Sequence, residues 1–264
     1  MRTAIFVALG IGLVATISAA VGLWEVGRFL PDDQRILAYQ PRAGQKLTPL
    51  IAIPPNVIHA FLAAEDGDFY RHPGIDIPLM LRAAAIDVVR LASDQRPLGA
   101  STITQQVVKN LLLSDEVSID RKVKEILLAL RLERQLSKGR ILEIYLNEVY
   151  LGCGAHGVAE AASRYFGKPV NALALGEAAF VAGLPKAPNH YSPAHFPEAA
   201  KARRDWVIDR MVEDGYVTPA DAAQAKETPI DTASLSSFCR VDAREFEVAT
   251  PTEGATERRT AQVH

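Results

Sequence analysis

Apolar residues recur at helical spacing through the middle of this chain, three and four positions apart, whereas no stretch alternates between apolar and polar residues as a half-buried strand does. The clearest stripe consists of Val123, Ile126, Leu127 and Leu130. Residues 77–92 follow the same helical period and are unusually apolar. This pattern predicts an all-α fold.

The first apolar run, residues 4–24, contains no charged residue and has the length of about 20 residues that a helix needs to cross a bilayer. Arg2 precedes the run, and the large remainder of the chain follows it. We therefore predict that residues 1–28 form a cytoplasmic tip and a single transmembrane anchor, with the rest of the chain outside the cytoplasm. A competing interpretation is a signal peptide that is cleaved near Ala20.

Changes in composition divide the remainder into three parts. Residues 29–55 are rich in proline and polar residues, which predicts an extended lead-in. Residues 56–228 carry the helical pattern and are predicted to form the folded domain. Residues 229–264 have few apolar residues to bury, so we predict a polar, disordered tail.

Composition narrows the classes of function. With 264 residues and 48% hydrophobic content, the chain is able to bury a proper core. A formal net charge of only -2 provides no global field that would recruit nucleic acid, so we expect no nucleic-acid partner. The two cysteines, Cys153 and Cys239, do not make a disulfide framework, and we do not expect them to pair.

Glu65 is the first candidate for chemistry. A helix that begins at Val57 places Ile58, Phe61 and Glu65 on one side, so the carboxylate points the same way as apolar side chains. Burial disfavours a charged carboxylate and raises its pKa, which is how a glutamate becomes a base or acid near neutral pH. The simpler alternative is a helix end that reaches water.

A second candidate follows a glycine-containing loop, where Ser101 or Thr102 is able to cap a helix. Gln106, Lys109 and Asn110 then share one face of that helix. Two amides and one cation suit a ligand rich in hydroxyl and phosphate groups. An ordinary solvated helix face is the alternative interpretation.

Two further helices carry polar groups among leucines. Arg121 and Glu125 are spaced to pair, and their apolar neighbours favour a position in a cleft or a packed interior. The alternative is an ordinary ion pair on the helix surface. Glu143, Asn147 and Tyr150 share a polar strip, for which we predict a buried hydrogen-bonded network that fixes helix packing.

Five motifs in order give these residues a specific resemblance, which covers about residues 56–215. The chain resembles the peptidoglycan glycosyltransferase domain, glycosyltransferase family 51, of class A penicillin-binding proteins and monofunctional glycan polymerases. The motifs are Glu65-Asp66-x-x-Phe69-x-x-His72-x-Gly74, Gly99-x-Ser101-Thr102-Ile103-Thr104-Gln105-Gln106, Arg121-Lys122-x-x-Glu125, Lys138-x-x-Ile141-Leu142-Glu143-x-Tyr145-Leu146-Asn147 and Arg203-x-x-x-Val207-Ile208-x-x-Met211.

The resemblance implies a lysozyme-like, all-α domain that is held on the outer, periplasmic side of the bacterial cytoplasmic membrane and polymerises lipid II. The donor would be a lipid-linked nascent glycan. Glu65 would deprotonate the acceptor hydroxyl, and Glu125 would support the leaving diphosphate. The family also admits a divalent cation, Mg²⁺ or Mn²⁺, at Glu125, and it implies no organic cofactor.

The resemblance assigns roles to further residues and partners. Membrane lipid and other cell-wall synthesis proteins are the additional partners it suggests. It implies substrate binding by Asp66, Phe69, His72, Ser101, Thr102, Gln106, Lys109, Asn110, Arg121, Lys122, Lys186 and Asn189. It implies structural support by Glu143, Asn147, Tyr150 and Arg203.

Three alternatives remain open at this point. A lysozyme or lytic transglycosylase would cut glycan with one glutamate and would not need the cations Lys109, Arg121 and Lys122 for a diphosphate. A catalytically silent cell-wall scaffold would tolerate loss of either glutamate. No Ser-x-x-Lys or Lys-Thr-Gly motif of a transpeptidase is found, and the chain is either monofunctional or part of a bifunctional protein.

Overall fold

The structure is a computed structural model that describes residues 30–91, 101–114, 116 and 118–231. Every regular element in these ranges is a helix, and the only β feature among them is an isolated bridge between Tyr150 and His156. The prediction of an all-α chain is confirmed for this part. Two compact units, Met1–Val149 and Tyr150–His264, make up the chain, and each is described by itself.

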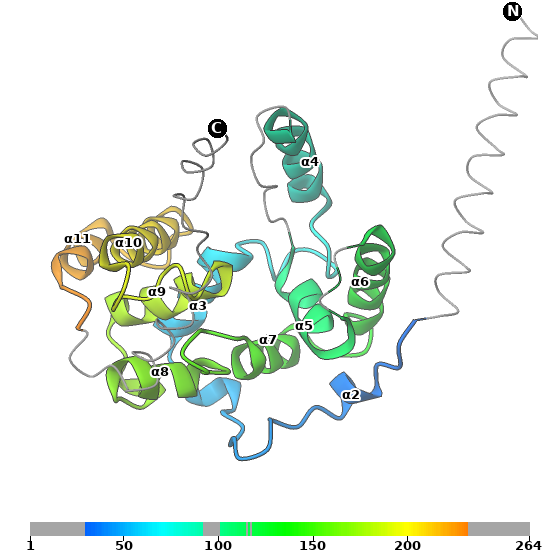
Figure 1. The fold of residues 1–264 in the computed structure, drawn as a ribbon, viewed down its shortest axis with the longest axis horizontal. Helices are drawn as coiled ribbons and strands as arrows, with labels where there is room; N and C mark the ends of the chain where they lie inside the picture. The colour runs from blue at the N-terminus through cyan, green and yellow to red at the C-terminus, as the bar shows by residue number, and fades with distance from the viewer. Residues whose placement is uncertain (1–29, 92–100, 115, 117, 232–264) are drawn as a thin grey trace, which may run out of the picture. The chain divides into compact units, whose positions relative to one another are not determined.

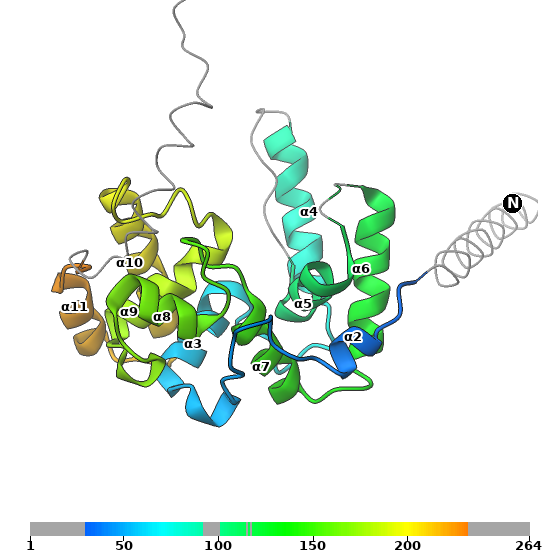
Figure 2. The same ribbon diagram turned by 60° about the horizontal axis from the view of Figure 1, so that its bottom comes forward.

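In the first unit, α5 packs against α6, α7 and the short α2, while η1 packs against α7. Figures 1 and 2 show α4 extending away from α5. The interior between the helices is apolar and includes Phe61, Ile103, Leu128 and Ile141. The elements are α2 (Gln34–Leu37), η1 (Leu50–Ala52), α3 (Pro55–Glu65), α4 (Ile77–Leu91), α5 (Ile103–Leu112), α6 (Ile119–Leu132) and α7 (Lys138–Glu148).

Side-chain caps explain where these helices begin. Thr102 caps α5 in a capping box with Gln105, as the sequence predicts. Ser137 caps α7. Helix α6 is capped by Ser118 and begins at Ile119.

The lead-in is joined to α7 by side-chain hydrogen bonds. Glu143 accepts from the Leu50 N–H at 2.8 Å, and the Asn147 amide both accepts from the Thr48 N–H at 2.8 Å and donates to the Thr48 carbonyl at 2.9 Å. The predicted polar network on this helix is therefore confirmed for Glu143 and Asn147, whereas Tyr150 lies beyond the end of α7 and is not buried. The lead-in is therefore part of the packed unit, and it contains α2 and η1 rather than extended chain alone.

Glu148 adds a second attachment for the lead-in. Its carboxylate accepts from the Arg42 guanidinium at 2.8 Å and from the Tyr39 hydroxyl at 3.2 Å. Burial and the Glu148 carboxylate raise the pKa of Tyr39, so this hydroxyl stays protonated and donates.

In the second unit, α9 packs against α8, α10 and α11. Arg204 on α10 is almost fully buried and donates to the carbonyls of Lys226 and Thr228 at the end of α11, at 2.7 and 2.5 Å. This buried guanidinium thus joins the last two helices. The elements are α8 (Val158–Phe166), η2 (Val170–Ala172), α9 (Leu175–Gly183), η3 (Leu184–Lys186), α10 (Pro197–Glu213) and α11 (Pro219–Glu227).

Two sequence predictions concern the ends of the chain. The anchor at residues 4–24 and nearly all of the tail at residues 229–264 lie outside the described residues. Among the helices that are described, none combines the length and apolar character required for a membrane span. Cys153 is disulfide-bonded, which corrects the expectation that the cysteines do not pair; the other cysteine, Cys239, lies outside the described residues.

Candidate active site

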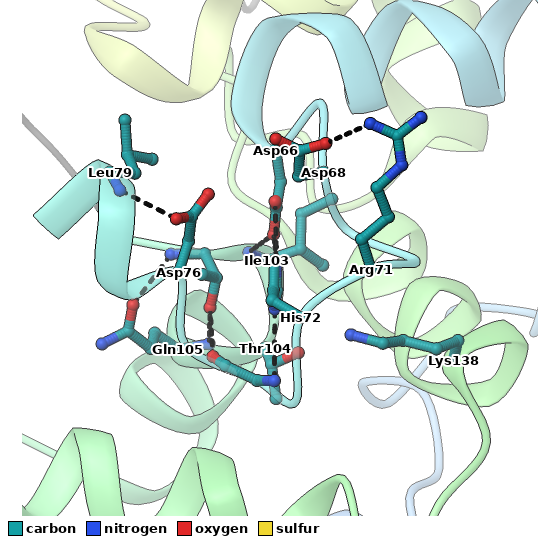
Figure 3. A network of polar contacts seen from close by, with 12 residues as sticks. Asp66, Asp68, Arg71, His72, Asp76, Leu79, Ile103, Thr104, Gln105 and Lys138 are labelled. Atoms are coloured by element: carbon teal, nitrogen blue, oxygen red, sulfur yellow. Dashed lines mark hydrogen bonds and ion pairs between the residues drawn. The ribbon is translucent and has the colours of Figure 1, made fainter.

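Hydrogen bonds join the turn after α3 to the start of α5. Asp66 accepts from the His72 Nε2–H at 2.9 Å and from the Ile103 N–H at 2.9 Å (Figure 3). The Gly74 N–H donates to His72 Nδ1 at 3.2 Å, so the hydrogen-bond network assigns the ring proton to Nε2. Asp66 and His72 are therefore engaged with protein groups that hold this turn in place.

Gly74 belongs to the same junction, which is the contact between the turn after α3 and the start of α5. The Thr102 hydroxyl donates to the Gly74 carbonyl at 2.6 Å, and the Gly74 backbone has φ = +97°. A Cβ at this position would lie 2.8 Å from Glu133 Cγ and 2.9 Å from the Ala129 carbonyl oxygen. Both the conformation and the close approach require glycine here.

The junction places Glu65, the last residue of α3, next to the first turns of α5. Gln106 Nε2 donates to Glu65 Oε2 at 2.8 Å, and Glu65 is half-buried. The Tyr145 hydroxyl on α7 lies 3.4 Å from Gln106 Oε1. Burial, followed by the charges of Glu65 and Asp66, raises the pKa of Tyr145 well above its ordinary value.

Glu125 occupies a buried, cationic site. Its side chain is only 2% exposed; Oε2 accepts from Arg121 Nη1 at 2.9 Å, and Oε1 accepts from Lys122 Nζ. Lys122 Nζ also donates to the Ser101 hydroxyl at 2.8 Å, while its side chain remains 37% exposed. The predicted pairing of Arg121 with Glu125 away from open solvent is confirmed.

Residues 101–106 therefore reach both glutamates. Gln106 bonds directly to Glu65, and Ser101 reaches Glu125 through Lys122. Lys109 and Asn110 follow Gln106 on α5 and are exposed, and their side chains make no hydrogen bond or ion pair with another described residue. Two carboxylates in different electrostatic surroundings, one facing an amide and one facing two cations, suit an acid–base or group-transfer site.

Glu133 is a member of this region that the sequence analysis missed. It is nearly buried and accepts from the Thr104 hydroxyl at 2.5 Å and from Lys138 Nζ at 2.8 Å. Lys138 Nζ also lies 4.3 Å from the centroid of the fully buried Phe69 ring. Glu133 ends a helix among Arg and Gln residues, a pattern typical of a solvated helix end, so local spacing gives no signal for its role.

Comparisons with known proteins identify the family of this chain. The sequence profile of a family described as Transglycosylase matches residues 33–212, a range that contains all five motifs. The chain belongs to the Transglycosylase family. The predicted resemblance to the peptidoglycan glycosyltransferase domain of class A penicillin-binding proteins is thereby confirmed.

Two relatives of this chain are described as Penicillin-binding protein 1A. The chain is 41% identical over 245 residues to Penicillin-binding protein 1A of Rickettsia felis, and the match covers 86% of this chain and 30% of that protein. It is 47% identical over 200 residues to Penicillin-binding protein 1A of Escherichia coli, covering 76% of this chain and 23% of that protein. The chain thus spans less than a third of the length of either relative.

A crystal structure of Penicillin-Binding Protein 1A from Haemophilus influenzae is also similar, with a TM-score of 0.42 and 24% identity over 77% of this chain and 21% of that chain. The family assignment rests on the sequence matches and not on this superposition.

Four sequence-predicted residues lie in the second unit of the Transglycosylase chain. Lys186 at the end of η3 and Asn189 after it are both exposed. Arg203 Nε donates to the Gly183 carbonyl at 3.1 Å. Tyr150 lies beyond the end of α7, is 39% exposed, and has its ring 5.0 Å from that of His156.

The residues around Glu125 do not fit a resident divalent cation. Both carboxylate oxygens already accept hydrogen bonds from cationic side chains. A hard divalent cation requires several oxygen ligands, and within the described residues no group of three or more His, Cys, Asp or Glu side chains is arranged to hold a metal ion. The chemistry below is therefore derived from protein groups alone.

Proposed function

We propose that this Transglycosylase chain is the membrane-anchored module that polymerises lipid II into β-1,4-linked glycan. The observation that carries the proposal is the contrast between the two glutamates. Glu65 faces the Gln106 amide, whereas Arg121 and Lys122 both bond to Glu125. A transfer reaction that releases a diphosphate needs a base at one end and cations at the other.

The proposed reaction is a single displacement. The 4-hydroxyl of the acceptor sugar gives its proton to Glu65, and the hydroxyl oxygen bonds to the anomeric carbon of the lipid-linked glycan. The bond between that carbon and the diphosphate oxygen breaks, and its electron pair leaves with the diphosphate. Because an α-linked donor becomes a β-linked product, the reaction inverts the anomeric centre.

Lys122 is suited to receive the charge that develops on the diphosphate. Its ammonium is held by Ser101 and Glu125, yet the side chain is partly exposed. A cation that is already oriented stabilises developing charge without reorganisation during the reaction. Arg121 supplies a second positive charge at the same carboxylate, and the exposed Lys109 supplies a third on α5.

The separation of the two glutamates stays a prediction. Inverting carboxylate-pair enzymes hold the two groups roughly 6.5 to 9.5 Å apart so that the acceptor fits between them. A sugar acceptor is larger than water, so we expect Glu65 and Glu125 to open onto one groove at or beyond the upper end of that range.

We also propose that the chain is attached to the membrane, with its domain on the periplasmic side of the bacterial inner membrane. A lysozyme-like fold and contacts with other cell-wall synthesis proteins are further parts of this proposal. Residues 4–24 supply the predicted anchor. Helix α4 supports a second lipid contact because Ile77 is 56% exposed and Leu81 is 67% exposed. Exposed large aliphatic side chains at helical spacing suit a lipid surface better than water.

The remaining predicted site residues take roles in the same reaction. We propose that the exposed Asn110, Lys186 and Asn189 contact substrate. Asp66 and His72, which are nearly buried and bond to other protein groups, would support the site by holding the turn that carries Glu65.

The experiment that tests this function incubates the purified full chain with fluorescently labelled lipid II in detergent. We expect glycan polymer on a gel and release of the lipid diphosphate. Cleavage of preformed glycan without polymer would instead support a hydrolase. A wild-type chain that neither makes nor cuts glycan would support a scaffold.

A further inference from the structure

Tyr145 is a buried polar side chain that the proposed reaction does not yet use. It is 1% exposed, and its ring packs edge-on against Phe61 of α3 with ring centroids 6.0 Å apart. Among the residues that the structure describes, Gln106 provides the only hydrogen-bond partner of the hydroxyl, at 3.4 Å from Oε1. The contact is long, but a buried hydroxyl without any partner costs free energy, so the pair is expected to persist.

The Gln106 amide has two chemically different ends. An ionised carboxylate only accepts hydrogen bonds, so Glu65 requires the NH₂ end of the amide, which lies 2.8 Å from its Oε2. A flipped amide would place its carbonyl oxygen against the carboxylate and would repel it. The group that holds the other end of the amide therefore helps to hold Glu65 in place.

Tyr145 meets that requirement. Its raised pKa keeps the hydroxyl protonated, so it donates to Gln106 Oε1 and favours the orientation in which Nε2 faces Glu65. The neighbouring Asp66 makes no hydrogen bond with this amide among the described residues; its oxygens accept from His72 and the Ile103 N–H.

We propose that Tyr145 is a positioning residue for the catalytic base, which acts on Glu65 through the Gln106 amide. The inference rests on the proposed function. It assigns to α7 a part in the chemistry beyond the packing of its apolar faces. Tyr145 itself need not touch substrate.

A double-mutant cycle tests this role with the full chain and labelled lipid II. Tyr145→Phe keeps the ring and removes only the hydroxyl; we expect kcat to fall about three- to tenfold with KM unchanged, the range that one uncharged hydrogen bond provides. In the Gln106→Ala background the same change should leave kcat within about twofold, because the group through which Tyr145 acts is gone.

Tyr39→Phe is the matched control, since Tyr39 is also a buried tyrosine whose hydroxyl donates to a carboxylate, that of Glu148. We expect Tyr39→Phe to lose about as much thermal stability as Tyr145→Phe and to keep full activity. Wild-type kcat in Tyr145→Phe, or an equal loss of kcat with and without Gln106, would overturn the positioning role alone. A wild-type chain that makes no polymer would overturn the proposed function, and this role with it.

Discussion

At the scale of single residues, Lys122 joins the loop before α5 to the buried Glu125. Its ammonium donates to the Ser101 hydroxyl and to the buried carboxylate of Glu125, which lies three residues later on the same helix. Burial of a carboxylate is tolerable only when partners compensate the lost hydration. Lys122 therefore serves the fold and the leaving group together.

Replacing Lys122 with Gln should reduce kcat for lipid II polymerisation by on the order of a hundredfold, because one oriented charge opposite the leaving group is lost. Lys124→Gln is the matched control, since Lys124 lies on the same helix and pairs with the exposed Asp120. We expect its kcat to stay within about twofold of wild type. Equal kcat values for the two variants, with both folded by circular dichroism, would contradict the role given to Lys122.

A contact between two side chains can be predicted from the sequence when both residues lie on one helix. Arg121 and Glu125 are four residues apart, so their pairing follows from helical spacing alone. Glu133 bonds to Thr104, 29 residues earlier in the chain. Local patterns contain no information on such a contact, because it depends on how α5 and the end of α6 pack.

At the scale of elements, the caps were predictable and the role of the lead-in was not. Thr102 and Ser137 are the residue types that cap helices, and each stands just before an apolar period. The sequence predicts an extended conformation for residues 29–55 because prolines interrupt the helical spacing of apolar residues there. Their hydrogen bonds to Glu143 and Asn147 come from α7, almost 100 residues later.

Asn147→Ala should destabilise the chain by about 1–3 kcal/mol, since the Thr48 N–H and carbonyl lose their partner in a largely buried position. The measurement is urea unfolding followed by circular dichroism. Asn171→Ala, at an exposed asparagine of η2, should change stability by less than about 0.5 kcal/mol. If the two variants unfold at the same urea concentration, the lead-in attachment is not a stabilising contact.

At the scale of the whole molecule, the account predicts two separate contacts with lipid. Deleting residues 1–24 removes the predicted anchor but leaves the exposed Ile77 and Leu81 of α4. The shortened chain should therefore float only partly with liposomes, and adding Ile77→Ser and Leu81→Ser should abolish flotation. Complete loss of flotation after the deletion alone would show that α4 makes no lipid contact.

The role of Glu65 as the base of a polymerisation reaction is tested by comparing three versions of the chain. Initial rates of lipid II polymerisation are measured for wild type, Glu65→Gln and Glu198→Gln, the last at an exposed position of α10, with lipid II binding measured in parallel. Gln keeps the shape of the side chain but cannot accept the proton. The account predicts that Glu65→Gln loses at least about a hundredfold in rate while it still folds and binds lipid II, and that Glu198→Gln matches wild type. Near-wild-type polymerisation by Glu65→Gln would contradict the account.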